Sequence, residues 1–208
     1  MYRMSENWYS DLVGLVETST NNNPRDECYT PHDIINRARE CMGSIDLDPA
    51  SCATANQVVR AETYYDKNSD GLTKRWFGNV WLNPPFTATL IRPFINKLWE
   101  SRSDIHQAIV LVPPYVDTDW AARLRQMANI VCMPRSRVEF WSNQRTLSTG
   151  AKQGHILYGI GLVDELLFVD CFSPIGDIQF TQIRVAQCES LTKFKSELIK
   201  LIITGDQP

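Results

Sequence analysis

The chain reads Val80-Trp81-Leu82-Asn83-Pro84-Pro85-Phe86, an apolar run followed at once by a stiff polar turn. The apolar run predicts a buried strand that ends where the turn begins. Each proline fixes its own φ at about −65° and keeps the preceding residue out of the helical region. The Asn83 side-chain oxygen and nearby backbone carbonyls can therefore converge on one point, with the Phe86 ring beside it. Such a turn suits a flat ligand that carries an amino group.

A second proline pair provides a control within the same chain. Val112-Pro113-Pro114-Tyr115 also follows an apolar run, residues 108–111, but valine stands where the first stretch has asparagine. It lacks the side-chain acceptor, and we expect an ordinary strand-to-helix loop. Asn-Pro pairs also open ordinary turns, so the interpretation of Asn83 depends on its structural context.

The composition is that of a globular protein of one domain. The chain has 208 residues, of which 43% are hydrophobic and 22% charged, so it can build a core. Its net charge of −3 does not by itself indicate nucleic-acid binding. A nucleic-acid partner would need a local basic surface, because positioned Lys and Arg side chains neutralise phosphates.

The cysteines and histidines give no metal-binding pattern. The six cysteines form no C-x-x-C pair, and His32, His106 and His155 are scattered along the chain. We therefore expect no metal site and a reduced, cytoplasmic protein without a signal peptide. No apolar stretch is long enough to predict a membrane span.

The order of apolar and polar stretches predicts an α/β domain. We expect an N-terminal arm over residues 1–25 and one domain over 26–208. Strands are predicted at 44–48, 80–82, 108–112, 130–133, 137–141 and 155–163, and helices at 31–42, 51–61, 87–101, 119–128 and 191–203. The alternation indicates a largely parallel sheet with helices on both faces. The last two strands would form an antiparallel pair across residues 142–154, and the last helix would pack against the domain.

Several elements carry end signals, and three strand ends carry candidate ligand-binding groups. Thr30 is the expected N-cap of the first helix, with Pro31 in its first turn and Gly43 as its C-cap. Asp48, Asn83 and Pro113 lie just past strand ends. In open α/β sheets ligands bind at that edge, so we expect the three residues to face one site.

Six short motifs follow one another along the chain, and their order and spacing are more specific than any one of them. They are Tyr29-Thr30-Pro31, Ile45 to Ser51, Asp70-Gly71-Leu72, Trp81 to Phe86, Ala108 to Val112, and Pro134 to Phe140. From about Cys28 to about Gly161 this order resembles the Dam-like DNA N-6-adenine methyltransferases of bacteriophages and prophages. The resemblance implies a single Rossmann-like methyltransferase domain that uses S-adenosylmethionine and methylates double-stranded DNA.

The resemblance also implies a role for each motif. The residues expected to bind S-adenosylmethionine are Tyr29, Thr30, Pro31, Asp48, Pro49, Ala50 and Asp70. The residues expected to form the catalytic tetrad are Asn83, Pro84, Pro85 and Phe86. The residues expected to contact the target base or DNA are Arg135, Arg137, Phe140 and Trp141. With Arg145 and Lys152, the two arginines would form a basic patch facing DNA.

The first cofactor motif departs from the usual methyltransferase pattern. No glycine follows Asp48-Pro49-Ala50-Ser51, although glycine is what usually lets backbone approach a cofactor closely. No acid clearly follows a second strand to hold the ribose hydroxyls, and Glu62 and Asp66 are the nearest candidates. The way in which the cofactor is held must therefore be taken from the structure.

Each motif has a purely structural alternative. Asp48 could cap a helix over residues 49–61, and Asp70-Gly71 could be a simple turn. Tyr29 could pack the first helix, and Phe140-Trp141 could belong to the core. Arg135 and Arg137 could form a solvated strand face.

Three other functions stay open at the level of the residues. Asn-Pro-Pro followed by an aromatic residue also occurs in methyltransferases that act on RNA or on protein glutamine. A non-catalytic DNA-binding module with a degenerate methyltransferase fold is a third alternative. The sequence contains no obvious separate target-recognition domain, so we expect a short DNA site read by loops such as 142–154.

Overall fold

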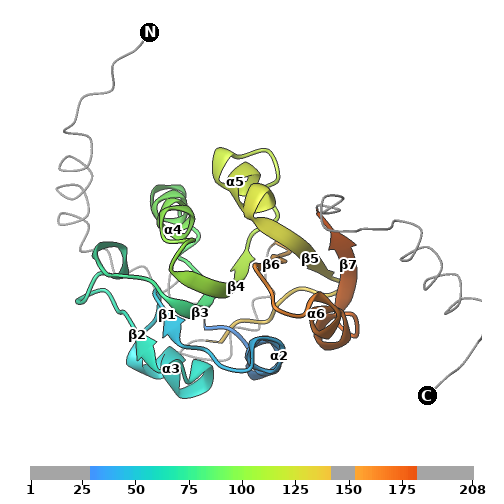
Figure 1. Cartoon of the computed structure of the whole chain (residues 1–208), viewed down its shortest axis with the longest axis horizontal. Helices are drawn as coiled ribbons and strands as arrows, with labels where there is room; N and C mark the ends of the chain where they lie inside the picture. Colours follow the sequence, from blue (N-terminus) through green and yellow to red (C-terminus); the bar gives the residue numbers. More distant parts are fainter. Residues whose placement is uncertain (1–28, 142–152, 182–208) are drawn as a thin grey trace, which may run out of the picture.

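The computed structural model describes residues 29–141 and 153–181, which form one seven-stranded sheet with helices on both sides (Figure 1). The strands lie in the order β2-β1-β3-β4-β6-β5-β7. Their bounds are β1 Leu47–Asp48, β2 Thr63–Tyr64, β3 Gly78–Leu82, β4 Ile105–Val112, β5 Ala128–Pro134, β6 Ile156–Ile160 and β7 Gly176–Phe180. The helices are α2 His32–Met42, α3 Ala53–Val59, α4 Ala88–Glu100, α5 Asp119–Met127 and α6 Glu165–Phe172, with a 3-10 turn, η1, at Gly71–Thr73.

The sheet has a parallel half and an antiparallel half. Strands β2, β1, β3 and β4 pair in parallel. Strand β6 lies antiparallel between β4 and β5, and β7 is antiparallel to β5. The predicted fold class, an α/β domain with a parallel core extended by C-terminal antiparallel strands, is confirmed.

The two faces of the sheet bury two separate apolar clusters. Along β4, Ile109 and Leu111 pack with α2 and α6, whereas Ala108, Val110 and Val112 pack with α4 and α5. Figure 1 shows α2, α3 and α6 on one side of the sheet and α4 and α5 on the other. This alternation follows from the two-residue period of a strand, and burial on both faces explains the unbroken apolar runs of the sequence.

The predicted strand at 137–141 is wrong. Strand β5 already pairs with β6 on one side and β7 on the other, so neither side of β5 is left for this segment. Within the described residues, its ladder contact is an isolated antiparallel bridge between Trp141 and Tyr29. The antiparallel partners of β6 are therefore β4 and β5.

Most helix and strand boundaries differ by a few residues from the sequence-based expectation, and those nearest the predicted cofactor segment matter most. The N-cap position of α2 is Pro31 rather than Thr30, and no side chain caps the helix there. The strand predicted at 44–48 is shortened to Leu47–Asp48, and the helix predicted at 51–61 is shortened to Ala53–Val59. Gly43 is the C-cap of α2 as predicted, with φ of 79°.

Strand β2, helix α6 and strand β7 were not predicted. The start of α6 carries a recognisable capping signal, because the Asp164 side chain accepts hydrogen bonds from the backbone N–H groups of Leu166 and Leu167. The predicted arm at 1–25 and helix at 191–203 lie outside the described residues. Within the described ranges, no helix combines the length and apolar character that crossing a bilayer requires.

Candidate active site at the strand ends

The topology brings residues from five strands to one edge of the sheet. Strands β1, β3, β4 and β5 run in the same direction and end at that edge, whereas β6 runs the opposite way and begins there. Leu82 pairs with Val110, and Val112 pairs with Ile156. Asn83, Pro113 and His155 therefore leave the sheet on the same side, as expected for Asn83 and Pro113.

The Asn83–Phe86 turn connects β3 to α4. Pro84 is buried, Asn83 and Phe86 are half-buried, and the Asn83 side-chain oxygen is shielded from solvent. Helix α4 begins at Ala88, with Thr87 in the N-cap position. Because the prolines hold the turn off the helical path, its carbonyl groups are not consumed by α4.

Phe86 packs into a cluster of three rings, which we call the aromatic cluster: Phe86, Phe140 and His155. The ring centroids of Phe86 and Phe140 lie 5.9 Å apart, and those of Phe86 and His155 lie 5.3 Å apart. Phe140 and His155 are 4.9 Å apart with an interplanar angle of 68°. The chain thus gathers three planar side chains from separate segments beside the Asn83 turn.

Phe140 and Trp141 have different surroundings although they are neighbours in the chain. Trp141 packs edge-on against Tyr29, with ring centroids 4.8 Å apart, and its indole N–H donates to the Thr30 carbonyl at 3.2 Å. Two backbone hydrogen bonds also join Tyr29 and Trp141. Tyr29 therefore has a packing role, but with Trp141 rather than with the first helix as considered, and it ties the predicted cofactor segment to the predicted base segment.

His155 is a site residue that the sequence did not predict. Its side chain is 6% exposed, and burial lowers the pKa of its imidazole to about 4. Its Nδ1 atom is buried and has no hydrogen-bond partner among the residues that the structure describes. The residue stands directly before a predicted strand, which could have placed it at an edge of the sheet but not beside Phe86.

Asp48 is a buried carboxyl group at the end of β1. It is 3% exposed, and burial raises its pKa to about 7 against the smaller opposing effect of nearby hydrogen-bond donors. The Ala50 backbone N–H donates to its Oδ1 at 3.3 Å. The capping alternative for Asp48 is wrong, because α3 begins at Ala53 and its N-cap is Cys52.

Asp70 is exposed and forms part of a turn, as its structural alternative predicted. Its Oδ1 accepts a hydrogen bond from the Leu72 backbone N–H at 3.1 Å, and it caps η1. The following residue, Gly71, lies so close to the Pro49 carbonyl that a Cβ atom would collide with it. The turn is therefore packed against the Asp48-Pro49-Ala50 segment, where the cofactor was expected.

The two acids considered for the cofactor ribose lie on either side of β2. Glu62 is exposed and precedes the strand, whereas Asp66 follows it by two residues. Asp66 accepts hydrogen bonds from the backbone N–H groups of Asn68 and Ser69, and the Ser69 backbone bond is the largest cause of its lowered pKa. Of the two, only Asp66 stands at the edge of the sheet that carries the site.

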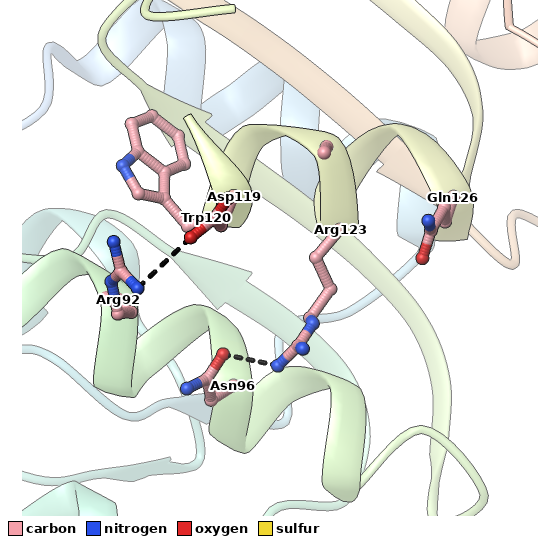
Figure 2. Close-up of a pocket in the computed structure, with 7 residues that line it drawn as sticks. Arg92, Asn96, Asp119, Trp120, Arg123 and Gln126 are labelled. Atoms are coloured by element: carbon pink, nitrogen blue, oxygen red, sulfur yellow. Dashed lines mark hydrogen bonds and ion pairs between the residues drawn. The ribbon is translucent and has the colours of Figure 1, made fainter. Parts of the chain in front are cut away.

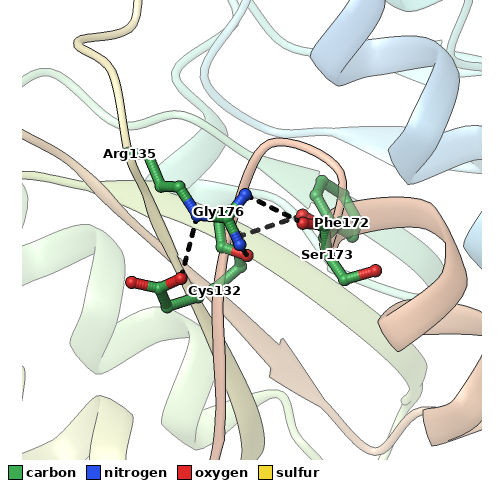
Figure 3. Close-up of polar contacts among 6 residues, drawn as sticks. Cys132, Arg135, Phe172, Ser173 and Gly176 are labelled. Atoms are coloured by element: carbon green, nitrogen blue, oxygen red, sulfur yellow. Dashed lines mark hydrogen bonds and ion pairs between the residues drawn. The ribbon is translucent and has the colours of Figure 1, made fainter.

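Arg135 has internal partners that the sequence did not indicate. Its guanidinium pairs with Asp177 at 3.0 Å and donates to the carbonyl oxygens of Ser173 and Gly176 (Figure 3). These bonds tie the α6–β7 turn to the end of β5. Arg137 is exposed, and the two other predicted members of the basic patch, Arg145 and Lys152, lie outside the described residues.

A pocket lies between α4 and α5, away from the predicted site residues. It has a volume of about 370 Å³, and Figure 2 shows Arg92, Asn96, Asp119 and Arg123 around it. Arg92 pairs with Asp119 at 3.3 Å, and Arg123 donates to the Asn96 side chain at 2.5 Å. Its arginines thus have partners within the pocket, and none of the predicted site residues lines it. Among the described ranges, no group of three or more His, Cys, Asp or Glu side chains is arranged to hold a metal ion.

The sheet and its strand-end residues define a Rossmann-like α/β protein. Residues 17–159 match the family model described as "DNA N-6-adenine-methyltransferase (Dam)", and the chain belongs to that methyltransferase family.

The chain was also compared with solved structures and with curated proteins. The structure, titled "Crystal structure of a dimethyladenosine transferase from Plasmodium falciparum", is similar at a TM-score of 0.42 and 10% sequence identity. The similarity covers 69% of this chain and 65% of that chain, which is less than two thirds of its length. No match is found among curated proteins.

Proposed function

We propose that the protein transfers a methyl group from S-adenosylmethionine to the exocyclic amino group of an adenine flipped out of double-stranded DNA. The observation that carries this proposal is the aromatic cluster beside the Asn83–Phe86 turn. Hydrogen-bond acceptors for an amino group and rings for a planar base are then adjacent. Membership of the Dam family supports the same substrate.

The residues at the end of β1 and before α2 fit S-adenosylmethionine. Its methionine part carries an ammonium group, which is a matched partner for the buried Asp48 carboxylate. Thr30 is buried, and its hydroxyl has no hydrogen-bond partner within the described residues, so it offers a polar contact to the same part. Tyr29, Pro31, Pro49 and Ala50 would line the remainder, with the Asp70 turn beside them.

S-adenosylmethionine supplies the methyl group on a positively charged sulfur, and the chain supplies positioning. The amino nitrogen of adenine is a poor nucleophile because its lone pair is delocalised into the ring. The Asn83 side-chain oxygen and the Pro84 carbonyl accept its two N–H groups, which favours a tetrahedral nitrogen with a localised lone pair. Positioning and oriented dipoles would account for the catalysis. No base is required before attack, because the nitrogen proton becomes acidic only after methylation and is then lost to solvent, while the cofactor leaves as the neutral thioether.

The aromatic cluster holds the base that the site needs. A base stacked inside a duplex cannot reach the strand edge, so the adenine flips out at a cost of a few kcal/mol. Phe86 stacks on the adenine, and Phe140, whose ring is in edge contact with Phe86 before the base enters, moves aside and then covers the other side. Trp141, which was the other candidate for this place, is held against Tyr29. Arg137 is exposed and is the predicted arginine we assign to a phosphate contact, because Arg135 is bonded to the α6–β7 turn.

A substrate-partition experiment tests the proposal. The purified protein is incubated with S-adenosylmethionine labelled in its methyl group and with unmethylated bacterial DNA, total RNA or a protein extract. We expect label in DNA alone. Label in RNA or protein would favour the alternative amino-methyltransferases. Cofactor binding is measured by calorimetry in parallel, and no binding together with no transfer would favour the non-catalytic module.

A further inference from the structure

His155 buries a polar atom at a position where an apolar ring would be more stable. Its ring packs against two phenylalanines that also contact each other, a place where a third phenylalanine would leave no polar atom buried. Instead its Nδ1 is buried and has no hydrogen-bond partner in the described part of the chain. A buried polar atom without a partner reduces stability, so such an atom needs an explanation. A ligand that completes the hydrogen bond provides one.

The register of the sheet places His155 near the catalytic turn. Val112 pairs with Ile156 across β4 and β6, and Leu82 pairs with Val110 across β3 and β4. His155 and Asn83 therefore leave the same sheet edge with only β4 between their strands. Phe86, from the turn itself, closes the gap by packing against the imidazole ring at 5.3 Å.

The chemistry of the imidazole matches a ring nitrogen of adenine. Because burial keeps the pKa of His155 at about 4, the ring is neutral near pH 7 and carries one N–H donor. In the proposed function, Asn83 and Pro84 take both N–H groups of the adenine amino group. The adjacent positions on the base, N1 and N7, are hydrogen-bond acceptors that need a donor.

We propose that His155 recognises the target base by donating its Nδ1–H to N1 or N7 of the flipped adenine, while Phe86 and Phe140 hold the ring. This inference rests on the proposed function and adds a specificity residue to it. The hydrogen bond forms only when the base enters, so it contributes to selection of the base rather than to binding of the cofactor.

A cycle of variant and substrate analogue tests the hydrogen bond. The substrates are duplexes with the target sequence mapped from methylated DNA, carrying adenine, 7-deazaadenine or 1-deazaadenine at the methylated position. We expect His155→Phe to lower kcat/KM on adenine about tenfold, the effect of one hydrogen bond. One analogue should lower the wild-type value by a similar factor, and His155→Phe should lose nothing more with that analogue. Losses that multiply for both analogues would overturn the proposal.

Controls separate this inference from folding and from the proposed function. His106 is exposed at the opposite end of β4, and His106→Gln should leave every ratio unchanged. If His155→Phe does not fold, His155→Gln replaces it, and a wild type indifferent to both analogues overturns the proposal without any variant. A wild type that methylates no DNA overturns the proposed function and this inference together. A wild type that methylates adenine but gives multiplying losses overturns only the role of His155.

Discussion

The two proline-pair turns leave neighbouring parallel strands at the same edge of the sheet, yet their aromatic residues lie in opposite environments. The first proline of each pair, Pro84 or Pro113, is buried. In the β3 turn, Phe86 packs against Phe140 and His155. In the β4 turn, Pro114 is exposed and Tyr115 is 47% exposed, with its hydroxyl bonded to the Gln153 side chain at 2.6 Å. Prolines make both turns stiff, but only in the β3 turn does the aromatic residue pack inward.

The difference shows that the residues around a proline pair decide its use. The β3 turn has a polar side chain before its prolines and an aromatic cluster beside it, and its strand is flanked by β1, which ends at the buried Asp48. The β4 turn has Val112 in the equivalent place, and its Pro114 and Tyr115 face solvent. We therefore expect substitutions in the two turns to have unequal effects on methyl transfer.

The largest difference should separate Asn83 from Val112. Asn83→Ala removes an oriented acceptor from the amino nitrogen, and we expect kcat for methyl transfer to fall by about 10²–10³-fold. Val112→Ala removes only core volume, so stability falls while kcat of the folded protein stays within a few fold. Single-turnover transfer and cofactor calorimetry measure both. Equal losses of kcat in the two variants would contradict the role assigned to Asn83.

Asp48 tests the cofactor side of the β3 turn. Asp48→Asn should weaken S-adenosylmethionine binding by about 1.5–3 kcal/mol, because a charge-assisted hydrogen bond to the ammonium group is lost. Calorimetric titration of both proteins gives this difference. Unchanged affinity would remove Asp48 from the cofactor site.

The raised pKa of Asp48 also predicts a pH dependence of stability. Its folded pKa of about 7 lies above the ordinary value of 3.8, so the folded state holds the proton more tightly than the unfolded state. The stability contributed by Asp48 is complete below about pH 4 and is lost as pH rises through 7. Without cofactor, Asp48→Asn should therefore match the wild type in thermal unfolding below pH 4 and exceed it at pH 8, with the difference growing between the two. A variant that is less stable at pH 8 would contradict the assigned burial.

Phe86 and Tyr115 form the next matched pair. Phe86→Ala should lower kcat/KM for DNA, through a higher KM or a lower kcat. The loss should correspond to about 1–3 kcal/mol of binding free energy, the range for a base stacked on an aromatic ring. Tyr115→Ala should change kcat/KM much less, since this ring faces solvent. Steady-state kinetics on one DNA duplex compares them. A larger loss from Tyr115→Ala would indicate that the base binds at the β4 turn instead.

The smallest effect is expected at the end of β5. The Arg135–Asp177 pair is largely exposed on both sides, so Asp177→Ala should change the free energy of unfolding by about 0.2–1 kcal/mol. Methyl transfer should be unaffected if the pair only ties the α6–β7 turn. Urea unfolding and a transfer assay report on the two properties separately. A selective loss of DNA affinity would instead support the predicted contact between Arg135 and DNA.

The sequence predicted those features that short segments determine. The apolar runs before both proline pairs became β3 and β4, and the residues past their ends reached one edge, as parallel strands require. Asp164 also carried a capping signal that could have predicted α6. Such features depend on neighbours in the chain.

The aromatic cluster could not be predicted in the same way. It depends on the insertion of β6 between β4 and β5 and on the Tyr29–Trp141 bridge, which holds Trp141 away from Phe140's partners. A pattern of alternating residues at 137–141 favoured a strand, because nothing local indicated that both sides of β5 were occupied. His155 joined the site for the same non-local reason.

Nucleoside analysis of methylated DNA tests the central claim most directly. Unmethylated DNA is incubated with the purified wild type or Asn83→Ala and S-adenosylmethionine, then digested to nucleosides and separated by liquid chromatography with mass detection. The account predicts N6-methyldeoxyadenosine with the wild type and its loss with Asn83→Ala. A different methylated nucleoside, or undiminished N6-methyldeoxyadenosine with Asn83→Ala, would contradict it.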